Sequence, residues 1–220
     1  MSGTNKVGRL AGARVTLRPA TVGDVVRLVE IRATPQVRAR WRGDDLETEV
    51  RDAIEDDELH LLVVEHDGDV IGAIQWAAEH DPDYHHASVD MFLDPSIHGR
   101  GLGTDAARTL CRHLLGDGGF HRLTIDPAAD NLAAIRCYQK VGFRTVGLMR
   151  RYERDLDGTW HDGTLMDILA EDLVSGDVAA PIGLTTGAND RSNNVSRLRL
   201  VGEVDESQVP GCVRGRNDEP

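Results

Sequence analysis

The chain has 220 residues, and its 25 Lys and Arg against 37 Asp and Glu give a net charge of −12 at pH 7. This length suits one domain with a full hydrophobic core plus an appendage. The negative charge opposes general attraction to nucleic acid or to an anionic membrane surface and favours a cationic partner. No apolar run is long enough to cross a bilayer, and the first 15 residues lack the apolar stretch of a secretory signal, so we expect a cytoplasmic protein.

Strand and helix patterns alternate through the first part of the chain. Residues 14–20 alternate like a strand, and residues 21–34 follow with helical spacing. Residues 44–56 place apolar side chains four apart, which predicts a second helix. Residues 58–79 contain two β-rich runs around the turn signal "HDGD" and predict an antiparallel hairpin.

The second part predicts a strand–helix–strand unit. Residues 86–94 form the next strand, a glycine-rich loop opens a helix with apolar residues on one face, and residues 121–126 form another strand. A helix over residues 131–142 follows, ending at a glycine, and residues 144–153 and 164–173 read as two further strands. The expected fold is therefore α/β, with a mixed central sheet of antiparallel N-terminal strands and a βαβ unit.

The expected domain spans residues 14–173. Residues 1–13 are expected to be a flexible N-terminus. Residues 174–220 contain scattered small and polar residues, no sustained periodicity and no aromatic residue, which predicts a disordered tail. The three cysteines show neither CxxC nor Cys/His ligand spacing, so we expect no disulfide framework and no metal site.

The loop "HGRGLG" packs three glycines at alternate positions before a helix, which indicates close approach to a ligand. It lacks the GxxxxGK run of a P-loop. Gly101, Gly103 and Ala106 spell GxGxxA, and Asp126 follows at the end of the next strand, as in a dinucleotide-binding turn. Against that interpretation, "DPSIH" separates the strand from the glycines, and an antiparallel hairpin precedes the unit. A tight turn with no ligand is the other alternative.

"MFLDPSIHGRGLG" followed by "NLAAIRCYQKVGF" resembles the GCN5-related N-acetyltransferase (GNAT) family over most of residues 14–173. The resemblance implies that backbone amides of the turn and the helix N-terminus bind the pyrophosphate of acetyl coenzyme A. His98 stands where the family commonly has Gln or Arg, so the resemblance implies a backbone contact to phosphate here and no side-chain contact. The implied donor-binding residues are Met91, Phe92, Leu93, His98, Gly99, Arg100, Gly101, Leu102, Gly103, Thr104 and Asn131.

Asn131 and Tyr138 lie on one face of the predicted helix, two turns apart. The resemblance implies that Asn131 binds the pantetheine arm, that Tyr138 protonates the leaving thiolate, and that the Leu93 N–H polarises the thioester carbonyl at a bulge in its strand. A phenol suits the acid role because it stays protonated at neutral pH. The alternative is that Asn131 caps the helix and Tyr138 is a core aromatic.

Asp90 and Asp126 each interrupt a β-rich run on strands that flank the glycine loop. Acids are disfavoured in strands, so we predict that these two carboxylates attract a cationic amine and accept its proton, although edge positions facing water would also explain them.

A narrower resemblance, to the aminoglycoside 6'-N-acetyltransferases, is carried by "SVDMFL", "GLGT" and "TIDPAADNLAAIRCYQKVGF". It implies that Asp90 and Asp126 line an aminoglycoside pocket with Trp41 nearby, although Trp41 could equally be a core aromatic. Glu79, Asp81 and Asp83 are predicted to form a rim for a polycation, with ordinary solvated loop charges as the alternative.

The resulting functional prediction is an acetyl-CoA-dependent enzyme, without a metal, that acetylates a primary amine, the 6'-amine of an aminoglycoside by resemblance. The expected partner is a small cationic amine, not nucleic acid or membrane, and the expected state is a monomer or homodimer. Two alternatives stay open: an acetyltransferase of protein N-termini, and a non-catalytic acetyl-CoA sensor.

Overall fold

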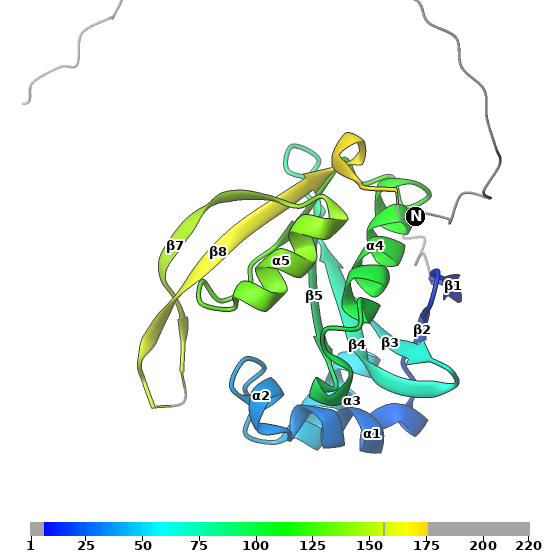
Figure 1. The fold of residues 1–220 in the computed structure, drawn as a ribbon, viewed down its shortest axis with the longest axis vertical. Coiled ribbons are helices and arrows are strands. Elements are labelled where there is room, and N and C mark those ends of the chain that lie inside the picture. Colours follow the sequence, from blue (N-terminus) through cyan, green and yellow to red (C-terminus); the bar gives the residue numbers. More distant parts are fainter. Residues whose placement is uncertain (1–6, 156, 176–220) are drawn as a thin grey trace, which may run out of the picture. The chain divides into compact units, whose positions relative to one another are not determined.

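The computed structural model describes residues 7–155 and 157–175, which lie within the first of two compact units, Met1–Ala180. An eight-stranded sheet has the order β1-β2-β3-β4-β5-β6-β8-β7 (Figure 1). The strands are β1 (Leu10–Ala11), β2 (Thr16–Pro19), β3 (Leu59–His66), β4 (Asp69–Ala78), β5 (Ala87–Leu93), β6 (Arg122–Ile125), β7 (Arg144–Arg154) and β8 (Trp160–Leu169). The α-helices are α1 (Val25–Arg32), α2 (Pro35–Arg38), α3 (Leu46–Glu55), α4 (Leu102–Leu115) and α5 (Leu132–Val141). Short 3₁₀ turns occupy Val22–Asp24, Pro95–Ile97 and Ala170–Asp172.

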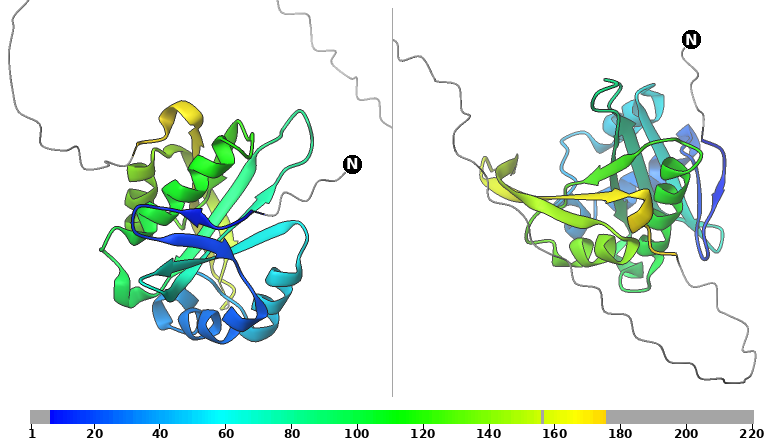
Figure 2. Two further views of the ribbon diagram at one scale, coloured as in Figure 1. Left: turned by 90° about the vertical axis from the view of Figure 1, so that its right-hand side faces the viewer. Right: turned by 90° about the horizontal axis from the view of Figure 1, so that it is seen from above.

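The helices form layers on the two faces of the sheet. Helices α1 and α3 cover one face, whereas α4 and α5 cover the other (Figures 1 and 2). The strand pattern explains both cores, because successive side chains point to opposite faces. In β3, Leu61 and Val63 pack with α1 and α3, whereas Leu62 and Val64 pack with α4.

The mixed sheet confirms the predicted fold class. Strands β1 to β5 pair antiparallel in succession, and β5 pairs parallel with β6 across α4. That parallel pairing covers only Ala87↔Leu123 and Ser88↔Thr124. Strand β5 then continues for five residues beyond Ser88 while β6 ends at Ile125, so the two strands part and open the sheet. This opening positions the candidate site.

The structured part of the chain extends past both predicted domain boundaries, residues 14 and 173. Residues 7–13 were expected to be flexible, but Val7 is only 5% exposed within the core and β1 pairs with β2. A two-residue strand has no detectable periodicity, which is why the sequence missed it. At the other end, the Val174 N–H donates to the Val141 carbonyl at 2.9 Å. The rest of the predicted tail, residues 176–220, lies outside the described residues.

The described part of the chain holds no helix that is both long and apolar enough to span a bilayer.

Candidate active site

The glycine turn lies between β5 and α4. Gly99 and Gly101 have φ of +75° and +81°, a region that side-chain-bearing residues rarely adopt. A Cβ on Gly99 would meet no atom within 4 Å, and one on Gly101 would meet only Arg14 Nη1, at 3.8 Å. Space is therefore open beside both glycines. Because Gly101 is the N-cap of α4, the unpaired N–H groups of that helix begin here and favour an anion.

Gly103 has a different role from its two neighbours. A Cβ at this position would lie 3.1 Å from Leu93 Cδ1 and 3.3 Å from Met91 Cε. The third glycine therefore lets the first turn of α4 pack closely on the end of β5.

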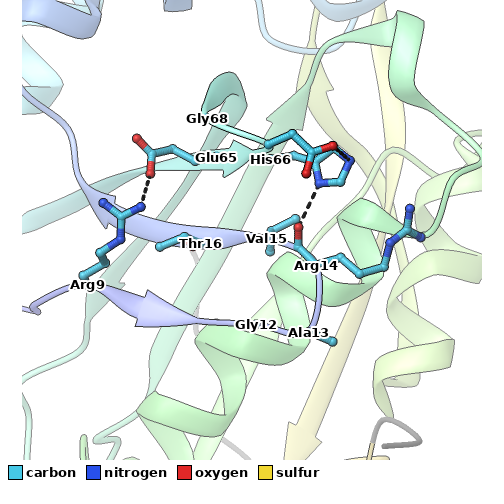
Figure 3. Close-up of a pocket in the computed structure, with 10 residues that line it drawn as sticks. Arg9, Gly12, Ala13, Arg14, Val15, Thr16, Glu65, His66 and Gly68 are labelled. Atoms are coloured by element: carbon cyan, nitrogen blue, oxygen red, sulfur yellow. Dashed lines mark hydrogen bonds and ion pairs between the residues drawn. The ribbon is translucent and has the colours of Figure 1, made fainter. Parts of the chain in front are cut away.

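The β1–β2 turn supports the glycine turn from outside. Arg14 Nη1 donates to the Arg100 carbonyl at 2.6 Å, and the buried Asp105 carboxylate accepts the N–H groups of Ala13, Arg14 and Val15 at 3.2, 2.7 and 3.1 Å. The turn also lines a hollow of about 430 Å³. In Figure 3 the Arg14 side chain is directed away from the Arg9–Glu65 ion pair.

A cavity of about 500 Å³ opens beside the glycine turn, between the end of β5, α2, α4 and α5. It brings together residues that the sequence predicted for donor binding and catalysis. These are Trp41, Met91, Phe92, Leu93, His98, Gly99, Gly101, Leu102, Gly103, Thr104, Asn131 and Tyr138. Arg100 does not line the cavity, and its carbonyl is engaged by Arg14.

The hydrogen-bond alternation along β5 shows which amides face the opening. In the antiparallel β4–β5 ladder, the Asp94 N–H donates to the Ile71 carbonyl at 2.8 Å. Because N–H groups alternate between the two edges of a strand, the N–H of Leu93 points away from β4, toward the gap left by β6. The β4–β5 register runs without a shift from Gly72↔Leu93 to Ala78↔Ala87, so the predicted bulge is wrong. The parting of β5 from β6, rather than a bulge, exposes this amide.

Asn131 and Tyr138 both line the cavity from α5. The Asn131 side-chain oxygen accepts the Ala134 N–H at 3.2 Å, so this residue caps the helix and keeps its NH₂ group as a donor. Tyr138 is 4% exposed, and its ring packs edge-on against Phe143 at 5.9 Å. Burial, followed by the nearby charge of Asp90, raises the pKa of Tyr138 well above its usual value of 10.0. This phenol is therefore protonated throughout the neutral range.

Asp90 is half-buried in β5, where this strand has left β6. Burial, opposed by the Met91 N–H at 2.8 Å and reinforced by the Asp126 charge, raises the pKa of Asp90 to about 7. The Trp41 side chain hydrogen-bonds to this carboxyl group and meets Phe92 edge-on at 4.7 Å. Trp41 thus connects the loop that follows α2 to Asp90 and Phe92 of β5.

Asp126 follows β6 directly, on the opposite side of the same gap. Tyr152 of β7 donates its hydroxyl to Asp126, and this hydrogen bond is the main cause that raises the pKa of Tyr152 to about 12. Charge interactions link Asp90 with both Asp126 and Glu153, so these carboxylates form one acidic cluster.

Two arginines beside Trp41 join the same loop to the rest of the site. Arg40 pairs with Asp130 before α5 at 2.6 Å. Arg42 pairs with Glu153, and its Nε lies 3.0 Å from Asp155. Sequence reasoning missed Arg42, Tyr152 and Glu153, because neither spacing nor a motif distinguishes them from ordinary surface residues of a helix end and a strand.

Several predicted residues do not line the cavity or face away from it, and Asp90 and Asp126, at the opening between β5 and β6, are not among its lining residues. Glu79 and Asp81 are in the β4–β5 loop, at the opposite end of β5 from the glycine turn, and do not line the cavity. Their carboxylates accept local backbone N–H groups at 3.0 and 2.9 Å. His98 lines the cavity, but its Nε2 lies 3.2 Å from the Leu93 carbonyl, so the ring is turned back onto β5.

The sequence model of the "Acetyltransferase (GNAT) domain" family matches residues 14–144, more than half of the chain. The chain belongs to the GNAT family of acetyltransferases. The dinucleotide-binding interpretation of the glycine turn is thereby replaced.

Among relatives of this acetyltransferase, aminoglycoside N(6')-acetyltransferase type 1 of Klebsiella pneumoniae is 31% identical over 153 residues, covering 60% of this chain and 75% of the relative. A solved structure of AAC(6')-Ib with paromomycin and acetyl-CoA is 26% identical, with a TM-score of 0.61, covering 72% of this chain and 95% of that one. Mycobacterium smegmatis RimJ, solved with CoA-disulfide, shares the fold at 24% identity and a TM-score of 0.65, covering 80% and 93%.

Proposed function

We propose that this acetyltransferase uses acetyl-CoA to acetylate the 6'-amine of an aminoglycoside. The observation that carries the proposal is the pair of carboxylates at the opening between β5 and β6: Asp90 lies on β5, and Asp126 directly follows β6. Carboxylates at this point attract an ammonium group to the place where a donor held by the glycine turn would present its acetyl group.

The glycine turn fits the donor. Gly99 and Gly101 leave open space beside their backbone at the N-terminus of α4, which suits a pyrophosphate. The outward N–H of Leu93 and the side-chain NH₂ of Asn131 supply donors along the cavity for the rest of the molecule. When bound there, acetyl-CoA supplies the acetyl group of the reaction.

Three groups then have separate catalytic roles: a base, a hydrogen-bond donor to the carbonyl oxygen, and an acid. Asp90 accepts a proton from the ammonium group, directly or through water, because its raised pKa leaves it basic enough near neutral pH. The Leu93 N–H donates to the thioester carbonyl oxygen while the amine attacks the carbonyl carbon. Tyr138 keeps its proton at neutral pH and donates it to the leaving sulfur.

The charge of the site supports a polycation as acceptor. Asp90, Asp126 and Glu153 lie close enough to interact, and the whole chain carries a net charge of −12. An aminoglycoside presents several ammonium groups to such a cluster, whereas a peptide N-terminus presents one. The relative that acetylates aminoglycosides at N6' supports the same class.

The direct test is product analysis. The chain is incubated with acetyl-CoA and a panel of kanamycin, a simple monoamine and a peptide with a free N-terminus, followed by mass spectrometry. We expect one added acetyl group on kanamycin and an NMR shift at the 6'-position. Acetylation of the peptide alone would replace the aminoglycoside with a protein N-terminus as acceptor, and coenzyme A binding without any transfer would favour the sensor.

The activity should depend on pH through Asp90. Its pKa of about 7, instead of 3.8, means that the base is protonated and inactive on the acid side of neutrality. We expect kcat/KM for the acceptor to fall about tenfold per pH unit below about pH 7. In Asp126→Asn the fall in kcat/KM should begin at a lower pH, because the Asp126 charge helps to raise the Asp90 pKa. A profile that stays flat to about pH 5 would remove Asp90 from the role of base.

Asp126→Asn also tests the substrate class. The change removes one carboxylate with little change in shape, so kcat/KM should fall about tenfold for kanamycin and much less for a monoamine. Steady-state kinetics with both acceptors provides the comparison. Asp57→Asn, at an exposed position before β3, changes the net charge equally and serves as the control. Equal losses in both variants would attribute the effect to overall charge.

A further inference from the structure

Strand β7 contains an irregularity next to the acidic cluster. Its register with β8 runs from Met149↔Gly163 to Glu153↔His161, so three residues of β7 stand opposite Asp162 alone. Arg151, in the middle, has φ of +52°, a backbone conformation that a residue with a side chain rarely adopts. The Asp162 carboxylate accepts the Arg151 N–H at 2.7 Å and stabilises this bulge.

The bulge determines where the Tyr152 ring lies. A Cβ on Gly163 would come within 2.8 Å of Tyr152 Cδ1, so the ring lies over this glycine of β8 and depends on its lack of a side chain. A bulge of this kind redirects the side chains that follow it.

The segment that carries Asp126 is attached to the same point of β8. Ala128 forms an isolated bridge with Gly163, and the Thr164 N–H donates to the Pro127 carbonyl at 2.8 Å. Strand β8 therefore holds both partners of the Tyr152–Asp126 hydrogen bond, one through the bulge and one through the bridge.

The Tyr152 side chain is placed to act on an acceptor. It is 50% exposed, so its ring is available to a bound molecule, while its hydroxyl is bonded to the carboxylate. Because the Tyr152 hydroxyl donates to the Asp126 carboxylate, it fixes the orientation of that carboxylate. The lone pairs of Asp126 that remain available to a ligand therefore have a fixed direction. The face of a tyrosine ring beside carboxylates also suits an ammonium ion.

We infer that Tyr152 is a positioning and specificity-determining residue of the acceptor site, which orients the Asp126 carboxylate toward a cationic amine and provides a wall for it. This inference rests on the proposed function, because it requires that Asp126 binds the acceptor. It extends the acceptor site from the carboxylates to an aromatic side chain of β7.

The test is a double-mutant cycle between Tyr152→Phe and Asp126→Asn. Tyr152→Phe removes only the hydroxyl, so the KM for kanamycin should rise about tenfold while the KM for acetyl-CoA stays unchanged. In the Asp126→Asn background, Tyr152→Phe should have a much smaller effect on the KM for kanamycin, because residue 126 no longer carries the charge that Tyr152 orients toward the ammonium group. Tyr84→Phe, at a 69%-exposed tyrosine in the β4–β5 loop, is the matched control and should behave as the unaltered chain.

The outcomes separate this inference from the proposed function. An unaltered chain that acetylates no amine overturns both. An active unaltered chain with a Tyr152→Phe variant that matches it, or with the same loss in both Asp126 backgrounds, overturns only the role of Tyr152. A change confined to melting temperature or to the KM for acetyl-CoA also overturns that role.

Discussion

Replacing Gly101 with valine is expected to weaken acetyl-CoA binding by at least about 100-fold while the protein still folds. At φ of +81° this residue begins α4, and the space beside it is where a pyrophosphate would approach the helix N-terminus. A valine strains the backbone and fills that space with a branched side chain. Titration calorimetry with acetyl-CoA measures the loss directly.

A second glycine provides the matched control for this prediction. Gly119, in the loop between α4 and β6, has φ of +71°, and a Cβ there would meet nothing within 4 Å. Gly119→Val therefore imposes similar strain, about 1–3 kcal/mol, far from the cavity. We expect both variants to lose similar stability in thermal unfolding and only Gly101→Val to lose the donor. Equal affinity for acetyl-CoA in the two folded variants would show that the glycine turn does not bind this donor.

The largest effect on turnover is expected from Tyr138→Phe. Tyr138 lines the cavity, and this change keeps its ring against Phe143 and removes only its hydroxyl. If the phenol protonates the leaving sulfur, kcat should fall by about 10²- to 10⁴-fold, with little change in the KM for either substrate. Steady-state kinetics with both substrates varied gives the required separation.

The same measurement distinguishes catalysis from packing. Tyr138 is buried, so a packing role would appear in the melting temperature. Retained turnover together with a lowered melting temperature would show that Tyr138 has a packing role and no catalytic one. Using an acetyl donor with a better leaving group than a thiolate provides an independent check, since it should reduce the effect of the change if the proton goes to the leaving atom.

The fold was largely predictable because its elements have strong local signals. The hairpin of β3 and β4 was evident from two β-rich runs around Asp67 and Gly68, and residues 67 and 68 both have positive φ in the structure. Helix α3 begins where the sequence suggested, with Asp45 accepting the Thr48 N–H. The two-residue strand β1 and the one-turn helix α2 were missed, because two residues cannot show a strand alternation and a single turn cannot show a helical repeat.

The donor side of the site was predictable for a related reason. A bound pyrophosphate requires consecutive backbone amides, so its signal is a contiguous glycine run, here residues 99–103. Asn131 and Tyr138 also lie on one helix, where spacing alone places them on one face.

The proposed acceptor side depends on tertiary structure. Asp90 and Asp126 were noticed as acids in strands, but the parting of β5 from β6 and the burial that raises the Asp90 pKa are properties of the sheet. Tyr152 reaches Asp126 only because a bulge at Arg151 redirects it. The conformation of a single segment can be predicted from its local sequence. A contact such as that between Asp126 and Tyr152, 26 residues apart, depends on how the strands of the sheet part and bulge. For this protein the sequence by itself determined the acetyltransferase fold and the glycine turn, and only the tertiary structure decided which side chains lie together where β5 and β6 part.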